Sequence, residues 1–180
     1  MGWKRVKQHY RISHIVHVSG GNICIGSVVD LERMVINPEG VIIRRPMRSD
    51  IEFDRFVREM DADPQSLVRL VTAEDEFDAQ RTVTVYTFAG GRILEKQCEA
   101  RGWPGVTHDG MLMYDHLFST DKAVTVVRAK ADARSAARAI QTDIDNTQLE
   151  LRKLKSGLSN AEAYLAQLEA DYPQEDWLHG

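Results

Sequence analysis

The segment Gly102–Ser119, GWPGVTHDGMLMYDHLFS, lies where the pattern of the chain changes. Before this segment apolar and polar residues alternate as in β-strands, and after it apolar residues recur at the spacing of a helix. The segment itself holds a Trp-Pro pair, an Asp-Gly pair and several aromatic side chains, which predicts a structured loop. The fold therefore divides into a β-rich part before the loop and a helical part after it.

A heptad seam dominates the sequence after the loop. An alanine-rich stretch begins the predicted helix, with Ser119 or Thr120 as its cap, and apolar residues then recur in alternating steps of three and four. The large apolar members of the seam are Ile140, Ile144, Leu151, Leu154, Leu158, Leu165 and Leu168. Because one helix cannot bury such a stripe alone, the seam predicts a homo-oligomer.

Two arrangements of this helical part remain open from the sequence. Ser156-Gly157 could end one helix and Ser159 could cap a second, which would give a helical hairpin. The heptad phase runs through Gly157 without a skip, however, which favours one continuous helix. Trp177 could dock back on the body of the protein.

The first part of the chain, residues 3–45, is predicted to be a meander of short antiparallel strands. Ser19-Gly20-Gly21-Asn22 and Asn37-Pro38-Glu39-Gly40 have the composition of hairpin turns. Ser49 is the expected N-cap of a short helix that follows, and Pro64 stops or restarts that helix.

A second hairpin is expected around Gly90-Gly91, either added to the first sheet or forming a sheet of its own. The predicted fold is α+β, with antiparallel β hairpins first and a long helix or helical hairpin last. Its expected parts are a β-rich module with short helices (1–80), a β-hairpin with a ligand-reading loop (81–119) and a helical oligomerisation element (120–172).

Composition restricts the class of protein. The 180 residues are 43% hydrophobic and 28% charged with a net charge of −4, which indicates a globular chain without the basic footprint of a nucleic-acid-binding protein. No apolar run approaches the length of a membrane span. Cys24 and Cys98 are expected to be reduced, buried thiols, so we predict a soluble protein of the cytoplasm.

Catalytic and metal-binding patterns are weak. No nucleophile has an obvious neighbouring base, although Asp115 and His116 could form an acid/base pair. His14 and His17 point to opposite faces of a strand and do not converge on a metal ion. We therefore predict no metal, no cofactor and no enzymatic activity.

The central loop is instead the candidate for ligand binding. Its aromatic residues could stack on a base, its arginines could hold phosphate, and its polar residues could hydrogen-bond a ribose or a base edge. The candidate ligand-binding residues are Arg101, Trp103, Asp109, Tyr114, His116 and Arg128. The alternative is that the aromatic side chains of the loop simply pack it onto the sheet.

The loop resembles a segment of small accessory proteins of tailed bacteriophages. The resemblance is carried by the pattern WPxVTxDGxxMYDHxF over residues 103–118. In those proteins an asparagine usually follows the Tyr-Asp or Tyr-Glu pair, and His116 stands in its place here.

The layout of residues 82–172 is similar to that of Thoeris anti-defence proteins, in which a small antiparallel sheet precedes long helices that mediate assembly. Those proteins hold a cyclic ADP-ribose signal between protomers without cleaving it. The resemblance implies a phage-encoded immune-evasion protein that sequesters a nucleotide-derived host defence signal. The alternative is a phage inhibitor or assembly factor that acts on a host or virion protein through its coiled-coil helix.

Overall fold

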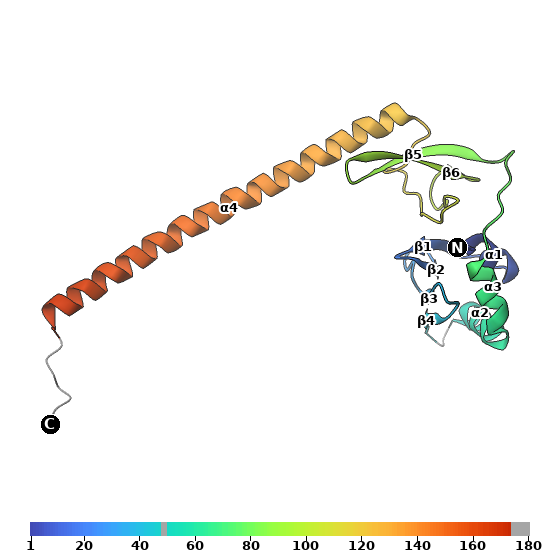
Figure 1. Cartoon of the computed structure of the whole chain (residues 1–180), viewed down its shortest axis with the longest axis horizontal. Helices are drawn as coiled ribbons and strands as arrows, with labels where there is room; N and C mark the ends of the chain where they lie inside the picture. The colour runs from blue at the N-terminus through green and yellow to red at the C-terminus, as the bar shows by residue number, and fades with distance from the viewer. Residues whose placement is uncertain (48–49, 174–180) are drawn as a thin grey trace, which may run out of the picture. The chain divides into compact units, whose positions relative to one another are not determined.

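The computed structural model describes residues 1–47 and 50–173. The helices are α1 (Trp3–His9), α2 (Ile51–Ala62), α3 (Pro64–Thr72) and α4 (Lys122–Asp171). The strands are β1 (Ile15–Ser19), β2 (Asn22–Gly26), β3 (Met34–Ile36), β4 (Ile42–Arg44), β5 (Val83–Ala89) and β6 (Arg92–Cys98) (Figure 1). The predicted α+β class is confirmed. The chain divides into two compact units, Met1–Ala129 and Lys130–Gly180.

Strands β1 to β4 form one antiparallel sheet in the order of the sequence. The predicted turns join them. Gly20 and Gly21 have φ of 55° and 79° between β1 and β2, a conformation that suits a tight hairpin. Between β3 and β4 the amide of Gly40 donates to the carbonyl oxygen of Asn37 over 3.0 Å.

The start of the chain differs from the prediction of strands from residue 3 onward. Residues Trp3–His9 form helix α1. Trp3, Val6 and Tyr10 are all buried because their spacing of three and four places them on one side of a helix. A strand would have placed Trp3 and Val6 on opposite faces.

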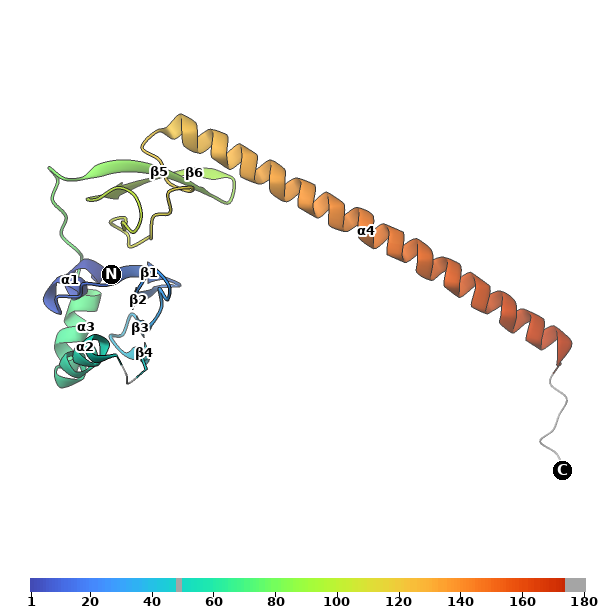
Figure 2. The same ribbon diagram turned by 180° about the vertical axis from the view of Figure 1, so that it is seen from behind.

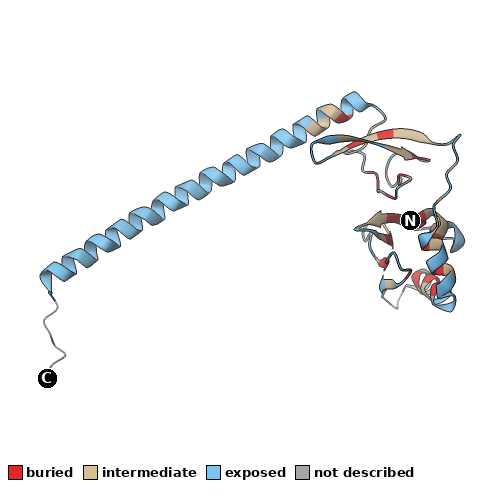
Figure 3. Cartoon of the chain, viewed as in Figure 1, coloured by how far each residue is buried: buried red, intermediate tan, exposed pale blue. Residues whose placement is uncertain are grey.

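Helices α2 and α3 complete the main core. Phe53 and Phe56 of α2 and Leu67 of α3 are fully buried with the apolar residues of β1, β2 and β3. Figure 3 shows buried stretches both on the helices and on the strands of the first sheet. The carboxylate of Asp50 accepts from the amide of Phe53 and caps α2. The two sequence hypotheses for Ser49 and Trp177 concern positions outside the described residues.

Strands β5 and β6 pair with each other and form a separate two-stranded sheet (Figure 2). The backbones of Tyr86 and Ser119 exchange two hydrogen bonds of 2.7 and 3.0 Å, so the chain returns to β5 before α4 begins. A small second core of Val85, Cys98 and Met113 lies beneath this sheet. The alternative of a sheet that stands apart from the first is therefore the one observed.

Helix α4 is continuous over 50 residues, so the helical hairpin considered for this part is not formed. Its first turn is capped by Asp121, whose carboxylate accepts from the amides of Ala123 and Val124, rather than by Ser119 or Thr120. The seven large seam residues are between 44% and 67% exposed. No helix in the described part of the chain combines the length and the apolarity that a bilayer span needs.

Candidate functional site

The loop of residues 99–119, between β6 and α4, is fixed mainly by its own backbone and by one buried hydroxyl. Thr107 is fully buried, and its Oγ1 accepts from the amide of Met111 over 2.9 Å. The amide of Met113 donates to the carbonyl oxygen of Gly105 over 2.8 Å. The peptide bond between Trp103 and Pro104 is cis. The loop is therefore the structured element that its turn residues predicted.

The three predicted aromatic ligand residues do come together in this loop. The rings of Trp103 and Tyr114 stack with centroids 4.8 Å apart, and Tyr114 lies 5.8 Å from the ring of His116. The carboxylate of Asp115 accepts from the amide of Trp103 over 3.1 Å and supports the stack. Because Trp103 and Tyr114 stack on each other, they do not form the two sides of a slot for a base.

Two of the predicted polar ligand residues are bonded within the protein. Nη1 of Arg128 donates to the carbonyl oxygens of Asp115 and Phe118 over 3.0 and 3.1 Å. The carboxylate of Asp109 pairs with Lys96 and accepts from the hydroxyl of Thr107. These contacts hold the loop to β6 and to the first turns of α4.

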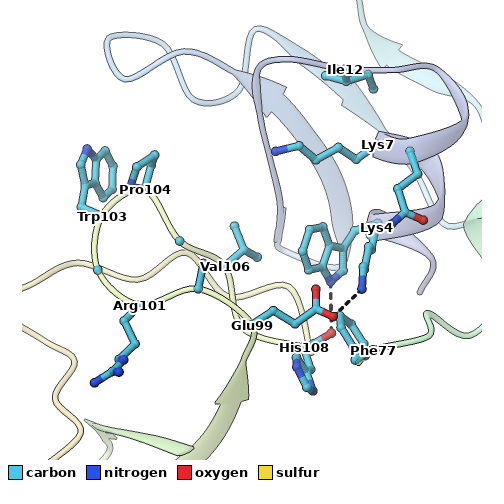
Figure 4. A pocket seen from close by; sticks show the side chains of 15 residues that line it. Lys4, Lys7, Ile12, Phe77, Glu99, Arg101, Trp103, Pro104, Val106 and His108 are labelled. Atoms are coloured by element: carbon cyan, nitrogen blue, oxygen red, sulfur yellow. Dashed lines mark hydrogen bonds and ion pairs between the residues drawn. The ribbon is translucent and has the colours of Figure 1, made fainter. Parts of the chain in front are cut away.

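A cavity of the unit Met1–Ala129 lies between α1 and the 99–119 loop. Its volume is about 590 Å³, and Arg101 and Trp103 line it, whereas the other four predicted ligand residues do not. Figure 4 shows the side chain of Lys7 extending from α1 toward the part of the loop that carries Trp103 and Pro104. Its principal lining residues are Trp3, Lys4, Lys7, Ile12, Phe77, Glu99, Arg101, Trp103, Pro104, Val106 and His108.

Hydrogen bonds across the cavity floor position α1 against the loop. Nε1 of Trp3 donates to the carbonyl oxygen of His108 over 3.1 Å. Nζ of Lys4 forms an ion pair with Glu99 at 2.8 Å and lies 4.6 Å from the ring centroid of Phe77. The ring of Phe77 also stacks on the imidazole of His108, with centroids 3.8 Å apart. The cavity floor is therefore ordered by residues far apart in the sequence.

Burial shifts the pKa values of the titratable groups in the cavity in opposite directions. Burial lowers the pKa of Lys7, and burial lowers the pKa of His108 despite the opposing charge of Glu99. Burial raises the pKa of Glu99, but the hydrogen bond from Lys4 and the amide of Asp78 outweigh it, so the net pKa is lowered. His108 is thus kept neutral and Glu99 charged near neutral pH.

Sequence reasoning missed the α1 side of this cavity. Lys4 and Lys7 lie in residues 3–45, for which the sequence predicts strands, and Trp3 is not among the predicted ligand-binding residues. The burial spacing of Trp3, Val6 and Tyr10 was the local signal that could have identified the helix. Nothing local pairs Trp3 with His108, which lies 105 residues later.

The described residues show neither a cluster of metal ligands nor an activated cysteine. No group of three or more His, Cys, Asp and Glu side chains among residues 1–47 and 50–173 is arranged to hold a metal ion. Cys24 and Cys98 are free and buried, as predicted. Burial raises the pKa of the Cys24 thiol to about 11 and also raises the pKa of Cys98, so neither is activated as a thiolate nucleophile.

No family model, no curated protein and no solved structure matches this chain.

Proposed function

We propose that this protein is a homo-oligomeric, protein-binding assembly factor whose copies join through a coiled coil of α4. The observation that carries the proposal is the exposed seam of α4, defined as Ile140, Ile144, Leu151, Leu154, Leu158, Leu165 and Leu168. Large apolar side chains repeated at heptad spacing on a helix of this length are typical of coiled coils. A second copy of the same helix presents the matching stripe, and each buried leucine contributes roughly 1.5–3 kcal/mol.

The charges that flank the seam favour a parallel, in-register pair. With Leu151 and Leu158 at position a of the heptad, Glu150 occupies position g and Lys155 the following position e. In a parallel pair these two positions face each other across the interface, so Glu150 of one copy meets Lys155 of the other. No like-charged g–e pair arises between residues 136 and 169 in this register.

Sedimentation velocity on three forms of the full chain tests the proposal. Wild type should sediment as an oligomer, and Leu151→Asp should shift it toward the monomer because a carboxylate would be buried in the seam. Leu149→Asp is the matched control, since Leu149 is a similarly exposed leucine at the outward position f. A monomeric wild type, or equal dissociation of both variants, would contradict the proposal.

Sequestration of a nucleotide-derived host defence signal is the second candidate. It is supported by the position of Arg101 and Trp103 on the wall of the 590 Å³ cavity, which has a volume suited to a small ligand. It has less support than the assembly role because Asp109 and Arg128 are engaged inside the protein. Calorimetric titration of the wild type with cyclic ADP-ribose tests this second candidate, and absence of binding would contradict it. A bacteriophage origin stays a prediction from the loop pattern.

A further inference from the structure

The cavity between α1 and the 99–119 loop holds a cation that the protein does not neutralise. This cation is Lys7, which lines the cavity and is partly buried. Its ammonium has no carboxylate within ion-pair distance among residues 1–47 and 50–173, whereas Lys4 in the same cavity is paired with Glu99. Partial burial without a partner disfavours the charged form of Lys7 and lowers its pKa. An anion bound here would remove that penalty.

The lining of the cavity as a whole also carries a net positive charge. Lys4, Lys7 and Arg101 are the cationic residues of the lining, and Glu99 is its single carboxylate. Figure 4 shows the side chain of Lys7 directed into the space and that of Arg101 directed away from it. Glu99 is paired within the protein, because its Oε1 accepts from Nζ of Lys4 and from the amide of Asp78, each over 2.8 Å. The charge of Glu99 is offset by Lys4, which leaves Lys7 as the cation in the cavity that can attract negative charge.

The remaining walls are apolar and partly aromatic. Ile12 is buried on the α1 side, and Pro104 and Val106 face it from the loop (Figure 4). The indole of Trp103 lines the same space and is held in place by its stack on Tyr114. Flat apolar groups bind well against a fixed indole. The walls thus suit an aromatic body, and Lys7 suits the anionic group attached to it.

We propose that this cavity binds a small aromatic anion, with the anionic group on Nζ of Lys7 and the ring system against Trp103 and Val106. The site is built entirely by residues of the unit Met1–Ala129 and does not depend on self-association of α4. Its volume of about 590 Å³ falls in the usual range for pockets that take small organic ligands, roughly 300–1,000 Å³.

The experiment compares two fluorescent probes that share an aromatic body and differ in charge. 1-Anilinonaphthalene-8-sulfonate carries a sulfonate, and N-phenyl-1-naphthylamine does not. The full-length wild type should bind the sulfonate probe with one site per chain and should bind the neutral probe more weakly. Added salt should weaken binding of the sulfonate probe only, because only that probe pairs with an ammonium. The salt dependence is measured on the wild-type protein alone.

Lys7→Gln identifies the cation. Loss of a charge-assisted contact should weaken binding of the sulfonate probe by about ten-fold or more and leave the neutral probe nearly unchanged. Lys153→Gln removes the same charge from an exposed position of α4 and serves as the matched control. Equal affinity of wild type and Lys7→Gln for the sulfonate probe, with far-UV circular dichroism showing both folded, would overturn the proposal, as would salt-independent binding by the wild type.

A competition experiment separates two sources of such an anion. Adenosine 5′-monophosphate should displace the bound sulfonate probe if nucleotides are the natural ligands. 1-Naphthoate alone should displace it if the ligands are aromatic acids without a sugar. Both results support an aromatic-anion site, and failure of both competitors to displace the probe contradicts it.

Discussion

The amide of Val18 in β1 donates a hydrogen bond to the carbonyl oxygen of Gly110 over 2.8 Å. This contact brings the α-carbon of Gly110 against the side chain of Val18, so a Cβ at position 110 would stand 2.2 Å from Cγ2 of Val18. Gly110 also has a φ of 89°, which residues with a side chain rarely adopt. The first sheet and the 99–119 loop therefore meet where only glycine fits.

Gly110→Ala should lower the free energy of unfolding by at least about 2 kcal/mol, since steric overlap and positive φ both oppose the methyl group. Gly91→Ala is the control, because Gly91 has a φ of 76° but nothing within 4 Å of its added Cβ. The control carries the backbone strain alone. Urea unfolding followed by tryptophan fluorescence measures both variants, and similar losses would show that the contact with Val18 matters little.

Arg128 is expected to stabilise the loop. Arg128→Ala removes two hydrogen bonds from a guanidinium to backbone carbonyls and should lower the free energy of unfolding by roughly 1–3 kcal/mol. Arg138→Ala, on an exposed turn of α4, should change it by less than about 0.5 kcal/mol. Urea unfolding measures both. Equal stability of the variants, with loss of cyclic ADP-ribose binding in Arg128→Ala alone, would instead support the ligand role that the sequence suggested.

The parallel register can be tested by charge reversal at Glu150 and Lys155. Each single reversal, Glu150→Lys or Lys155→Glu, places like charges opposite each other and should weaken the oligomer by roughly 0.5–1 kcal/mol per pair. The double reversal restores opposite charges and should return the dissociation constant toward that of wild type. Sedimentation equilibrium at low salt measures the series. An antiparallel pairing predicts no recovery in the double variant, although the protein would still associate.

Asp109 should make the folded state sensitive to acid. Burial raises the pKa of Asp109, but hydrogen bonds from Lys96 and Thr107 outweigh burial and hold the net pKa below the ordinary value of 3.8. A carboxyl group with a lowered pKa stabilises the fold fully above its unfolded pKa, and this stability is lost as pH falls through the folded pKa.

Asp109→Asn should therefore destabilise the protein at pH 7 and flatten the decline of stability between about pH 5 and pH 2. Asp132→Asn removes the same charge from an exposed position of α4 and should leave that decline unchanged. Thermal unfolding across this pH range measures the difference. A decline as steep in Asp109→Asn as in wild type would assign the acid sensitivity to other groups.

Local patterns predicted the elements whose signals are local. The turns at Gly20-Gly21 and Gly90-Gly91, the strands beside them and the heptads of α4 all follow from residues within a few positions of one another. Helix α1 was missed because its seven residues carry only two buried apolar side chains among four charged or titratable ones. The spacing of Trp3, Val6 and Tyr10 fits a helix, but seven residues are fewer than the roughly 11–18 over which a helical period is usually judged.

The site was predicted only in part because its geometry depends on distant contacts. Arg101 and Trp103 were chosen for their chemistry, and both line the cavity. Arg128 was chosen on the same ground, but its guanidinium is bonded to two carbonyls of the loop that precedes it. Lys7 could not be identified, since its place beside Trp103 follows from the packing of α1 on a loop nearly one hundred residues later.

Gly157 locally lowers the stability of helix α4. It lies inside α4 without a side chain, and nothing else lies within 4 Å of its missing Cβ. A glycine at such a position weakens the helix by roughly 1 kcal/mol relative to alanine. Amide protons around residue 157 should then exchange with solvent sooner than those one or two heptads away. The interior of the helix would open there first, so the longer segment before Gly157 and the shorter segment after it would leave a partner in separate steps.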